Sequence, residues 1–148
     1  MCRGRGSLLL VLLLAGCGKD ANEPELVPVA GTVTLNGAPL AGATVSFIPL
    51  DETHGSGAEG RTDKEGKYRL KYRTGREGAP AGEYKVAIIK YVLPDGSDAP
   101  PDVPPADSPG RPLLPPAYSD PEQTTLKKTV APGGGPIDFD LQVQRKRP

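Results

Sequence analysis

Residues 62–72 read Thr-Asp-Lys-Glu-Gly-Lys-Tyr-Arg-Leu-Lys-Tyr, a turn followed at once by a strictly alternating run. The Asp and the Gly suit the turn, because Asp can bond to nearby backbone and Gly can adopt the left-handed conformation. In the run that follows, Tyr68, Leu70 and Tyr72 share one face and three basic residues share the other. A period of two is typical of a half-buried β-strand, so these three side chains are predicted to point into a core.

Similar short patterns on both sides of this segment predict six further strands. They are residues 29–35, 43–49, 57–62, 83–91, 125–130 and 137–143. Asn36-Gly37 follows the first of them and is a strong hairpin signal, because both residues tolerate a positive φ. Residues 83–91 are apolar on both faces, which indicates a central strand or one covered by a loop. Seven short strands without a helical period predict an all-β fold, a two-sheet β-sandwich.

The strand faces also predict the core. Its expected members are Val29, Gly31, Val33, Leu35, Val45, Phe47, Tyr68, Leu70, Tyr72, Tyr84, Val86, Ile88, Ile137, Phe139, Leu141 and Val143.

Three motifs occur in a recognisable order. Gly-Thr-Val at 31–33 leads to Gly-Ala-Pro-Leu-Ala-Gly-Ala-Thr-Val at 37–45, then come the turn at 62–68 and Pro-Ala-Gly-Glu-Tyr-Lys-Val at 80–86. Together they resemble carboxypeptidase regulatory-like domains, which have a seven-stranded transthyretin-like or Ig-like sandwich. The resemblance covers residues 29–143 and is greatest to small bacterial lipoproteins that carry one such domain. It implies a non-catalytic role, because in carboxypeptidases this module is an accessory to the catalytic domain.

The start of the chain has the pattern of a signal peptide. Arg3 and Arg5 precede an apolar run at 7–14, which is shorter than the roughly 20 residues that span a bilayer. Leu-Ala-Gly-Cys at 14–17 then resembles the bacterial lipobox. The resemblance implies cleavage of a signal peptide, residues 1–16, and lipid attachment to Cys17.

The resemblance to lipoproteins extends to location and processing. In that family an Asp after the cysteine favours the inner membrane, and Gly18 stands there, so we expect the cell envelope and the outer membrane. Residues 17–28 are polar and Pro-containing and are predicted to be a flexible tether. The basic residues of 144–148 are predicted to be a solvated tail. Cys2 is lost with the signal peptide, so no disulfide is expected.

Overall charge excludes one class of partner. The chain has 18 basic and 18 acidic residues. This balance does not predict nucleic-acid binding.

A segment rich in proline interrupts the strand pattern. Residues 94–121 hold 10 of the 18 prolines, which predicts a long loop outside regular structure. Within it, Leu113, Leu114 and Tyr118 form an apolar island. Either the island folds back over a sheet edge or the end of the core, or it is an exposed docking site.

Residues that could carry chemistry are few. His54 is the only histidine, and its loop has no nucleophile elbow, so a solvent-exposed loop residue is expected and no catalytic residue is assigned. Asp138 and Asp140 share a strand face but provide too few oxygens for calcium, so a solvated face is preferred. No metal and no cofactor are predicted.

The basic face of the first segment is the remaining candidate. Lys67, Arg69 and Lys71 could meet anionic polysaccharide or lipid headgroups, or they could protect an edge strand against aggregation. Tyr91 and Tyr118 are the candidate platforms for sugar stacking.

The predicted function follows from the anchor and the sandwich. We expect a lipid-anchored, non-enzymatic envelope protein with a structural or protein-interaction role. The alternatives are a polysaccharide-binding module at the cell surface and an accessory subunit of an envelope enzyme or transporter.

Overall fold

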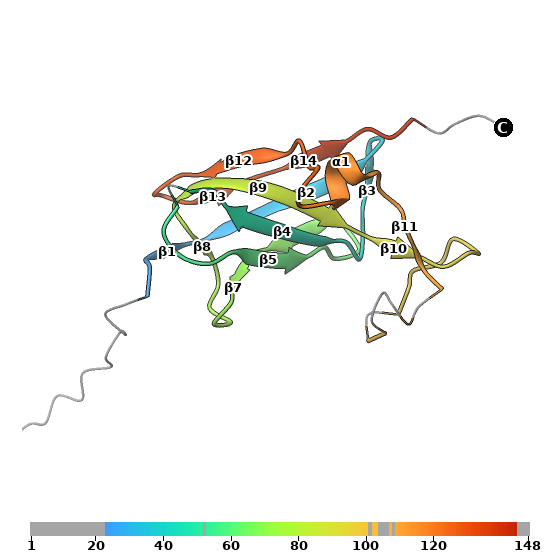
Figure 1. The fold of residues 1–148 in the computed structure, drawn as a ribbon, viewed down its shortest axis with the longest axis horizontal. Helices are drawn as coiled ribbons and strands as arrows, with labels where there is room; N and C mark the ends of the chain where they lie inside the picture. Colours follow the sequence, from blue (N-terminus) through green and yellow to red (C-terminus); the bar gives the residue numbers. More distant parts are fainter. Residues whose placement is uncertain (1–22, 52, 101, 104–106, 108, 145–148) are drawn as a thin grey trace, which may run out of the picture.

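The computed structural model describes residues 23–51, 53–100, 102–103, 107 and 109–144, and their fold is all-β, as predicted (Figure 1). One five-stranded sheet has the order β12-β9-β4-β5-β7. These strands are β4 (Thr44–Pro49), β5 (Ala58–Arg61), β7 (Lys71–Tyr72), β9 (Gly82–Ile89) and β12 (Lys127–Val130). Every pairing in this sheet is antiparallel.

The second five-stranded sheet is built around β2. It comprises β2 (Val29–Leu35), β3 (Ala38–Pro39), β6 (Lys67–Arg69), β13 (Gly135–Pro136) and β14 (Phe139–Leu141). β3 and β6 pair antiparallel with β2, whereas β13 and β14 pair with it in parallel. β2 therefore has neighbours of both orientations, and it is the central strand of its sheet.

Two short strand pairs and one helical turn complete the described chain. β1 (Leu26–Val27) pairs with β8 (Ala79–Pro80), and β10 (Tyr91–Val92) pairs with β11 (Arg111–Pro112). α1 (Pro116–Ser119) is a single helical turn in contact with β9. Within the described part of the chain, no helix has the length and apolar character of a membrane span.

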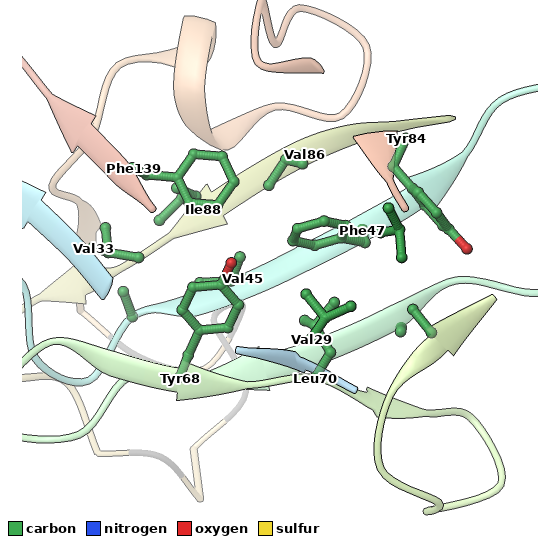
Figure 2. Packing of buried hydrophobic residues seen from close by; sticks show 14 of the residues in the cluster. Val29, Val33, Val45, Phe47, Tyr68, Leu70, Tyr84, Val86, Ile88 and Phe139 are labelled. Atoms are coloured by element: carbon green, nitrogen blue, oxygen red, sulfur yellow. The ribbon is translucent and has the colours of Figure 1, made fainter. Parts of the chain in front are cut away.

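The core lies between the two sheets and contains side chains from both (Figure 2). Phe47 of β4 and Phe139 of β14 meet edge to face, with ring centroids 6.2 Å apart. The side chains that are at most 1% exposed include Val33, Val45, Phe47, Leu70, Tyr84, Val86, Ile88 and Leu141. The predicted inward faces are confirmed for these residues. Leu35, Ile137 and Val143 are only partly buried and pack against the rim of the core.

The predicted number of seven strands is not confirmed, because one predicted strand is divided and additional short strands are present. Residues 67–72 form β6 and β7, which separate at Leu70. The Leu70 N–H donates to the Val29 carbonyl and its own carbonyl accepts from the Gly78 N–H, so the chain changes partners there. The predicted strand at residues 137–143 is shortened to β14, and β13 precedes it as an additional strand; between the two, Asp138 Oδ1 accepts the Thr32 N–H at 2.7 Å.

β9 is a central strand, as its apolar faces predict. It lies between β12 and β4, and Ala87 on its second face is fully buried. Thr124 Oγ1 donates to the Val86 carbonyl at 2.6 Å, just before β12 begins.

The proline-rich segment contains more regular structure than predicted. β11 and α1 both lie within residues 94–121. Proline is compatible with both, because Pro116 occupies the first turn of α1, where its missing N–H costs no helical hydrogen bond. The prediction that this whole segment lacks regular structure is therefore wrong.

The amino-terminal end of the described chain is fixed to the domain. Arg76 Nη1 lies 2.7 Å from Glu23 Oε2, and β1 pairs with β8. Val27 is buried, so the last residues of the predicted tether belong to the folded domain. The predicted signal peptide, Cys17 and Arg145 to Arg147 lie outside the described residues. In Figure 1 this end lies opposite the β10–β11 hairpin along the long axis.

Candidate functional site

A broad groove on the outside of the sandwich is the candidate site. It has a volume of about 1390 Å³ and crosses the outer faces of β4, β5, β7, β6 and β2 as far as β13. Its basic lining residues are Arg61, Lys67, Arg69, Lys71 and Arg73. Its acidic lining residues are Glu59, Asp63 and Asp138, and its hydroxyl side chains include Thr32, Thr44 and Ser46. We call this surface the outer groove.

The basic stripe predicted from sequence lies in this groove. Lys67, Arg69 and Lys71 are exposed, whereas the alternate side chains point into the core, as Figure 2 shows for Tyr68 and Leu70. Tyr68 Oη donates to the Ile137 carbonyl at 2.6 Å, which ties β6 to the segment between β13 and β14. Burial raises the pKa of the Tyr68 hydroxyl, so it stays a donor at neutral pH.

A second tyrosine fixes the far end of the stripe. Tyr72 Oη accepts a hydrogen bond from the Ser56 N–H at 2.9 Å, and this bond lowers the pKa of the Tyr72 hydroxyl. The nearby Arg73 guanidinium acts in the same direction. The inner face thus holds residues 67–72 at both ends, and the basic side chains project from a fixed backbone.

The basic stripe lies on two strands that are terminal in their sheets, at the place where the two sheets meet. β6 pairs with β2, and β7 pairs with β5, so this segment joins the two sheets. β5 also packs closely on β6, since a Cβ at Gly60 would lie 2.3 Å from the Arg69 carbonyl oxygen. Edge protection therefore accounts for the stripe only in part, because β5 covers β6 closely at Arg69 although each strand has a single strand partner.

The turn before the stripe positions its first cation. Asp63 Oδ1 accepts the N–H groups of Glu65 at 3.0 Å and Lys67 at 2.9 Å. Gly66 has a φ of 76°, the left-handed conformation that the motif predicts. The turn thereby fixes the start of β6.

Charges in the groove are incompletely paired. The ion pairs among the described residues are Arg76–Glu23 and Lys90–Asp98, and neither includes a lysine or arginine of the groove. Lys71 has Glu59 and Glu77 as cross-strand neighbours, which offset its charge. Lys67 and Arg69 pair across with the uncharged Thr32 and Ala30. Lys67 and Arg69 thus have no carboxylate directly across the strand pair, although Asp63 Oδ1 accepts the Lys67 N–H and Asp138 Oδ1 accepts the Thr32 N–H.

The apolar island is divided between core and surface. Leu114 is 3% exposed and belongs to the core cluster, and Tyr118 packs against that cluster. Tyr118 Oη donates to the Gln142 carbonyl at 3.2 Å. These contacts favour the covering role over docking for both residues. Leu113 is 37% exposed, so it alone of the three offers substantial apolar surface.

The other predicted candidates lie apart from one another. His54 is exposed in a loop, as expected. Asp138 accepts a backbone hydrogen bond, and Asp140 Oδ1 accepts from Thr34 Oγ1 at 2.9 Å, so both carboxylates contribute to strand pairing. Tyr91 lies on β10, outside the groove lining. The described residues contain no group of three metal-ligating side chains.

Sequence reasoning did not assign the groove residues outside the stripe. Glu59 and Arg61 alternate with buried residues on β5, and this alternation is visible in the sequence. Thr32 and Asp138 could not be assigned in this way, since they reach the groove only through strand pairing distant in sequence. Comparisons of the chain with protein-family models, with curated proteins and with solved structures find no match.

Proposed function

We propose that this chain is a lipid-anchored protein of a bacterial cell envelope, with a non-catalytic β-sandwich that serves a structural or interaction role. The signal peptide of residues 1–16 is removed, and Cys17 carries the lipid. Two or more acyl chains bind a membrane far more firmly than one, so this processing would hold the domain stably. The outer membrane is the proposed location, on the basis of Gly18.

The observation that carries the proposal is that the domain has two distinct ends along its long axis, one of which holds the amino-terminal residues. The first described residues are fixed at one end by the Glu23–Arg76 ion pair and by β1, and the β10–β11 hairpin lies at the other end (Figure 1). Glu23 lies six positions after Cys17, and six chain steps can extend over at most about 20 Å. A lipid on Cys17 would therefore hold the domain by one defined end and expose its long sides and far end.

We further propose that the finer fold is the seven-stranded transthyretin-like sandwich of carboxypeptidase regulatory-like domains. The motif residues adopt conformations that support this. Asn36 and Gly37 have φ values of 50° and 83°, as a hairpin turn requires. Tyr84, in the third motif, is fully buried and its hydroxyl donates to the Pro80 carbonyl at 2.7 Å. These are structural uses of the motifs, in keeping with a non-catalytic domain.

Metabolic labelling with a fatty acid tests the anchor directly. Label should enter the wild-type protein, be lost in Cys17→Ser, and be retained in the matched control Cys2→Ser, because Cys2 leaves with the signal peptide. The wild-type protein should also stay in the membrane fraction after an alkaline wash, whereas Cys17→Ser should not. Label retained by Cys17→Ser, or a wild-type protein that is released by the wash, would overturn the proposed anchor.

Crosslinking in cells tests the interaction role. A defined partner should crosslink to the anchored protein and be reduced for Cys17→Ser, which is no longer held at the membrane. If the same proteins crosslink equally to both forms, an anchored interaction role is wrong.

A further inference from the structure

The outer groove carries positive charge that no ion pair neutralises. The stripe joins the two sheets and β5 covers β6 closely at Arg69, so edge protection accounts for its charges only in part. Among the described residues, the side chains of Lys67, Arg69 and Lys71 form no ion pair and no hydrogen bond, although the Lys67 backbone N–H donates to Asp63 Oδ1. Exposed cations left without partners inside a groove favour an anionic ligand.

The spacing of the cations favours a repeating ligand. Alternate residues of a strand lie roughly 7 Å apart on the same face. Lys67 and Arg69 are therefore neighbours on the outer face of β6, Lys71 continues the row on β7, and Arg61 lines the same groove from β5. A row of this kind matches a chain with charges at regular intervals better than a single small anion.

The direction of the row argues against a flat bilayer. The long strands run along the long axis of the domain, and the end attached to the predicted anchor lies at one tip of that axis (Figure 1). β6 is antiparallel to the long strand β2, so in a domain held by that tip the row that starts at Lys67 and Arg69 rises away from the membrane. A flat surface could then contact one end of the row, whereas a polymer chain in the groove could follow all of it.

The groove lining indicates which kind of polymer. The aromatic lining residues Phe47, Tyr68 and Tyr72 are at most 4% exposed, so none offers a ring face to a sugar. Recognition must then depend on charge and hydrogen bonds. Thr32, Thr44 and Ser46 supply hydroxyls, and Glu59 supplies a carboxylate that can accept from ligand hydroxyl groups.

We infer that the outer groove binds a linear acidic polysaccharide, with Lys67 and Arg69 as the principal contacts to its carboxylates. This inference rests on the proposed function, because an envelope location is where such a polymer would meet the domain. Lys71 contributes less, since Glu59 and Glu77 flank it. The binding is electrostatic, so it weakens as salt concentration rises.

Titration calorimetry with polygalacturonate tests the inference, using the full chain carrying Cys17→Ser so that no lipid takes part. Lys67→Gln/Arg69→Gln should weaken binding about tenfold or more at low ionic strength. Arg111→Gln/Lys127→Gln is the matched control, because it removes one lysine and one arginine that are exposed on β11 and β12, outside the groove lining. The control should bind within about threefold of the unmodified chain.

Each other outcome overturns the inference. If the groove pair and the control pair of substitutions weaken polygalacturonate binding equally, the polymer is attracted to the overall charge of the protein and not to the groove. If neutral dextran binds as tightly as polygalacturonate, the binding does not depend on charge. Phosphatidylglycerol vesicles that bind as tightly, and are weakened by the same groove pair, would assign the site to lipid headgroups. Absence of polygalacturonate binding also overturns it. Because the measurement uses unanchored protein, it is independent of whether Cys17 is lipidated.

Discussion

The two faces of residues 67–72 differ in almost every physical respect, although they alternate along one short segment. The inner side chains, Tyr68, Leu70 and Tyr72, are at most 4% exposed and lie in the interior. The outer side chains, Lys67, Arg69 and Lys71, are exposed and form no ion pair among the described residues. The inner face therefore determines where the segment lies and how the two sheets join. The outer face has no comparable part in stability, which leaves it available for binding.

A change that displaces the backbone behind the inner face should have the largest effect. A Cβ at Gly31 would lie 1.9 Å from the Ile137 carbonyl oxygen, which is the acceptor for Tyr68 Oη. Gly31→Ala should lower the free energy of unfolding by about 4 kcal/mol, because backbone must move. Urea denaturation measures this. Gly133→Ala, where the new Cβ meets nothing within 4 Å, should change it by less than about 0.5 kcal/mol. If both substitutions lower the free energy of unfolding equally, Gly31 does not lie as close to the Ile137 carbonyl as described.

A cavity at the centre of the inner face should have the next largest effect. Leu70→Ala should lower the free energy of unfolding by about 3 kcal/mol, since Leu70 is fully buried between the sheets. Leu113→Ala removes the same atoms from a side chain that is 37% exposed, and it should cost less than about 1 kcal/mol. A small loss for Leu70→Ala would mean that the joining segment is not part of the core.

Alkaline pH should produce a loss of folding stability that is smaller than that of the two substitutions above. Burial raises the pKa of the Tyr84 hydroxyl to about 12, above its ordinary value near 10. A raised pKa in the folded state gives stability that is complete below pH 10 and is lost as pH rises through about 12. Thermal unfolding followed over this range should show a smaller loss for Tyr84→Phe than for the unmodified chain. Tyr91→Phe, a change at a partly exposed tyrosine, is the control, and an identical profile for all three proteins would contradict the burial effect.

Removal of one inner hydroxyl should have a smaller effect. Tyr68→Phe keeps the ring but leaves the Ile137 carbonyl without its 2.6 Å donor. The free energy of unfolding, measured by urea denaturation, should fall by about 1.5 kcal/mol. Tyr91→Phe removes a hydroxyl with no hydrogen-bond partner among the described residues and should be close to neutral. A neutral Tyr68→Phe would show that this bond does not help join β6 to the second sheet.

The outer face should give the smallest change in stability. Lys67→Gln/Arg69→Gln removes two exposed cations that have no paired carboxylate, so the free energy of unfolding should change by less than about 0.5 kcal/mol. Urea denaturation measures it beside Tyr68→Phe, the residue between them. A loss as large as that of Tyr68→Phe would remove the distinction between the two faces.

The features that depend on residues close together in the sequence, namely strand faces and turns, were predicted correctly. The alternation of residues 67–72 correctly separated inward from outward side chains, and the turn at residues 62–66 was recognised from its Asp and Gly. The change of partner at Leu70 could not be predicted, because alternation states which way a side chain points and not which strand lies beside it. The parallel pairing of β13 and β14 with β2 joins residues more than a hundred positions apart, for the same reason.

The candidate site was predictable to a similar extent. The three cations of the stripe were identified from sequence, but their groove was not, because Thr32 and Asp138 meet them only through long-range pairing. The proline-rich segment was harder still. Proline content predicts what a segment avoids, whereas the burial of Leu114 depends on the space left beside β9 and α1.

The most direct test of the division between the faces combines two measurements on one variant, Lys67→Gln/Arg69→Gln. Its affinity for polygalacturonate and its free energy of unfolding are compared with those of the unmodified chain, both carrying Cys17→Ser. We expect affinity to fall about tenfold or more while the free energy of unfolding changes by less than about 0.5 kcal/mol. Unchanged affinity, or a loss of affinity that accompanies an equivalent loss of stability, would contradict it.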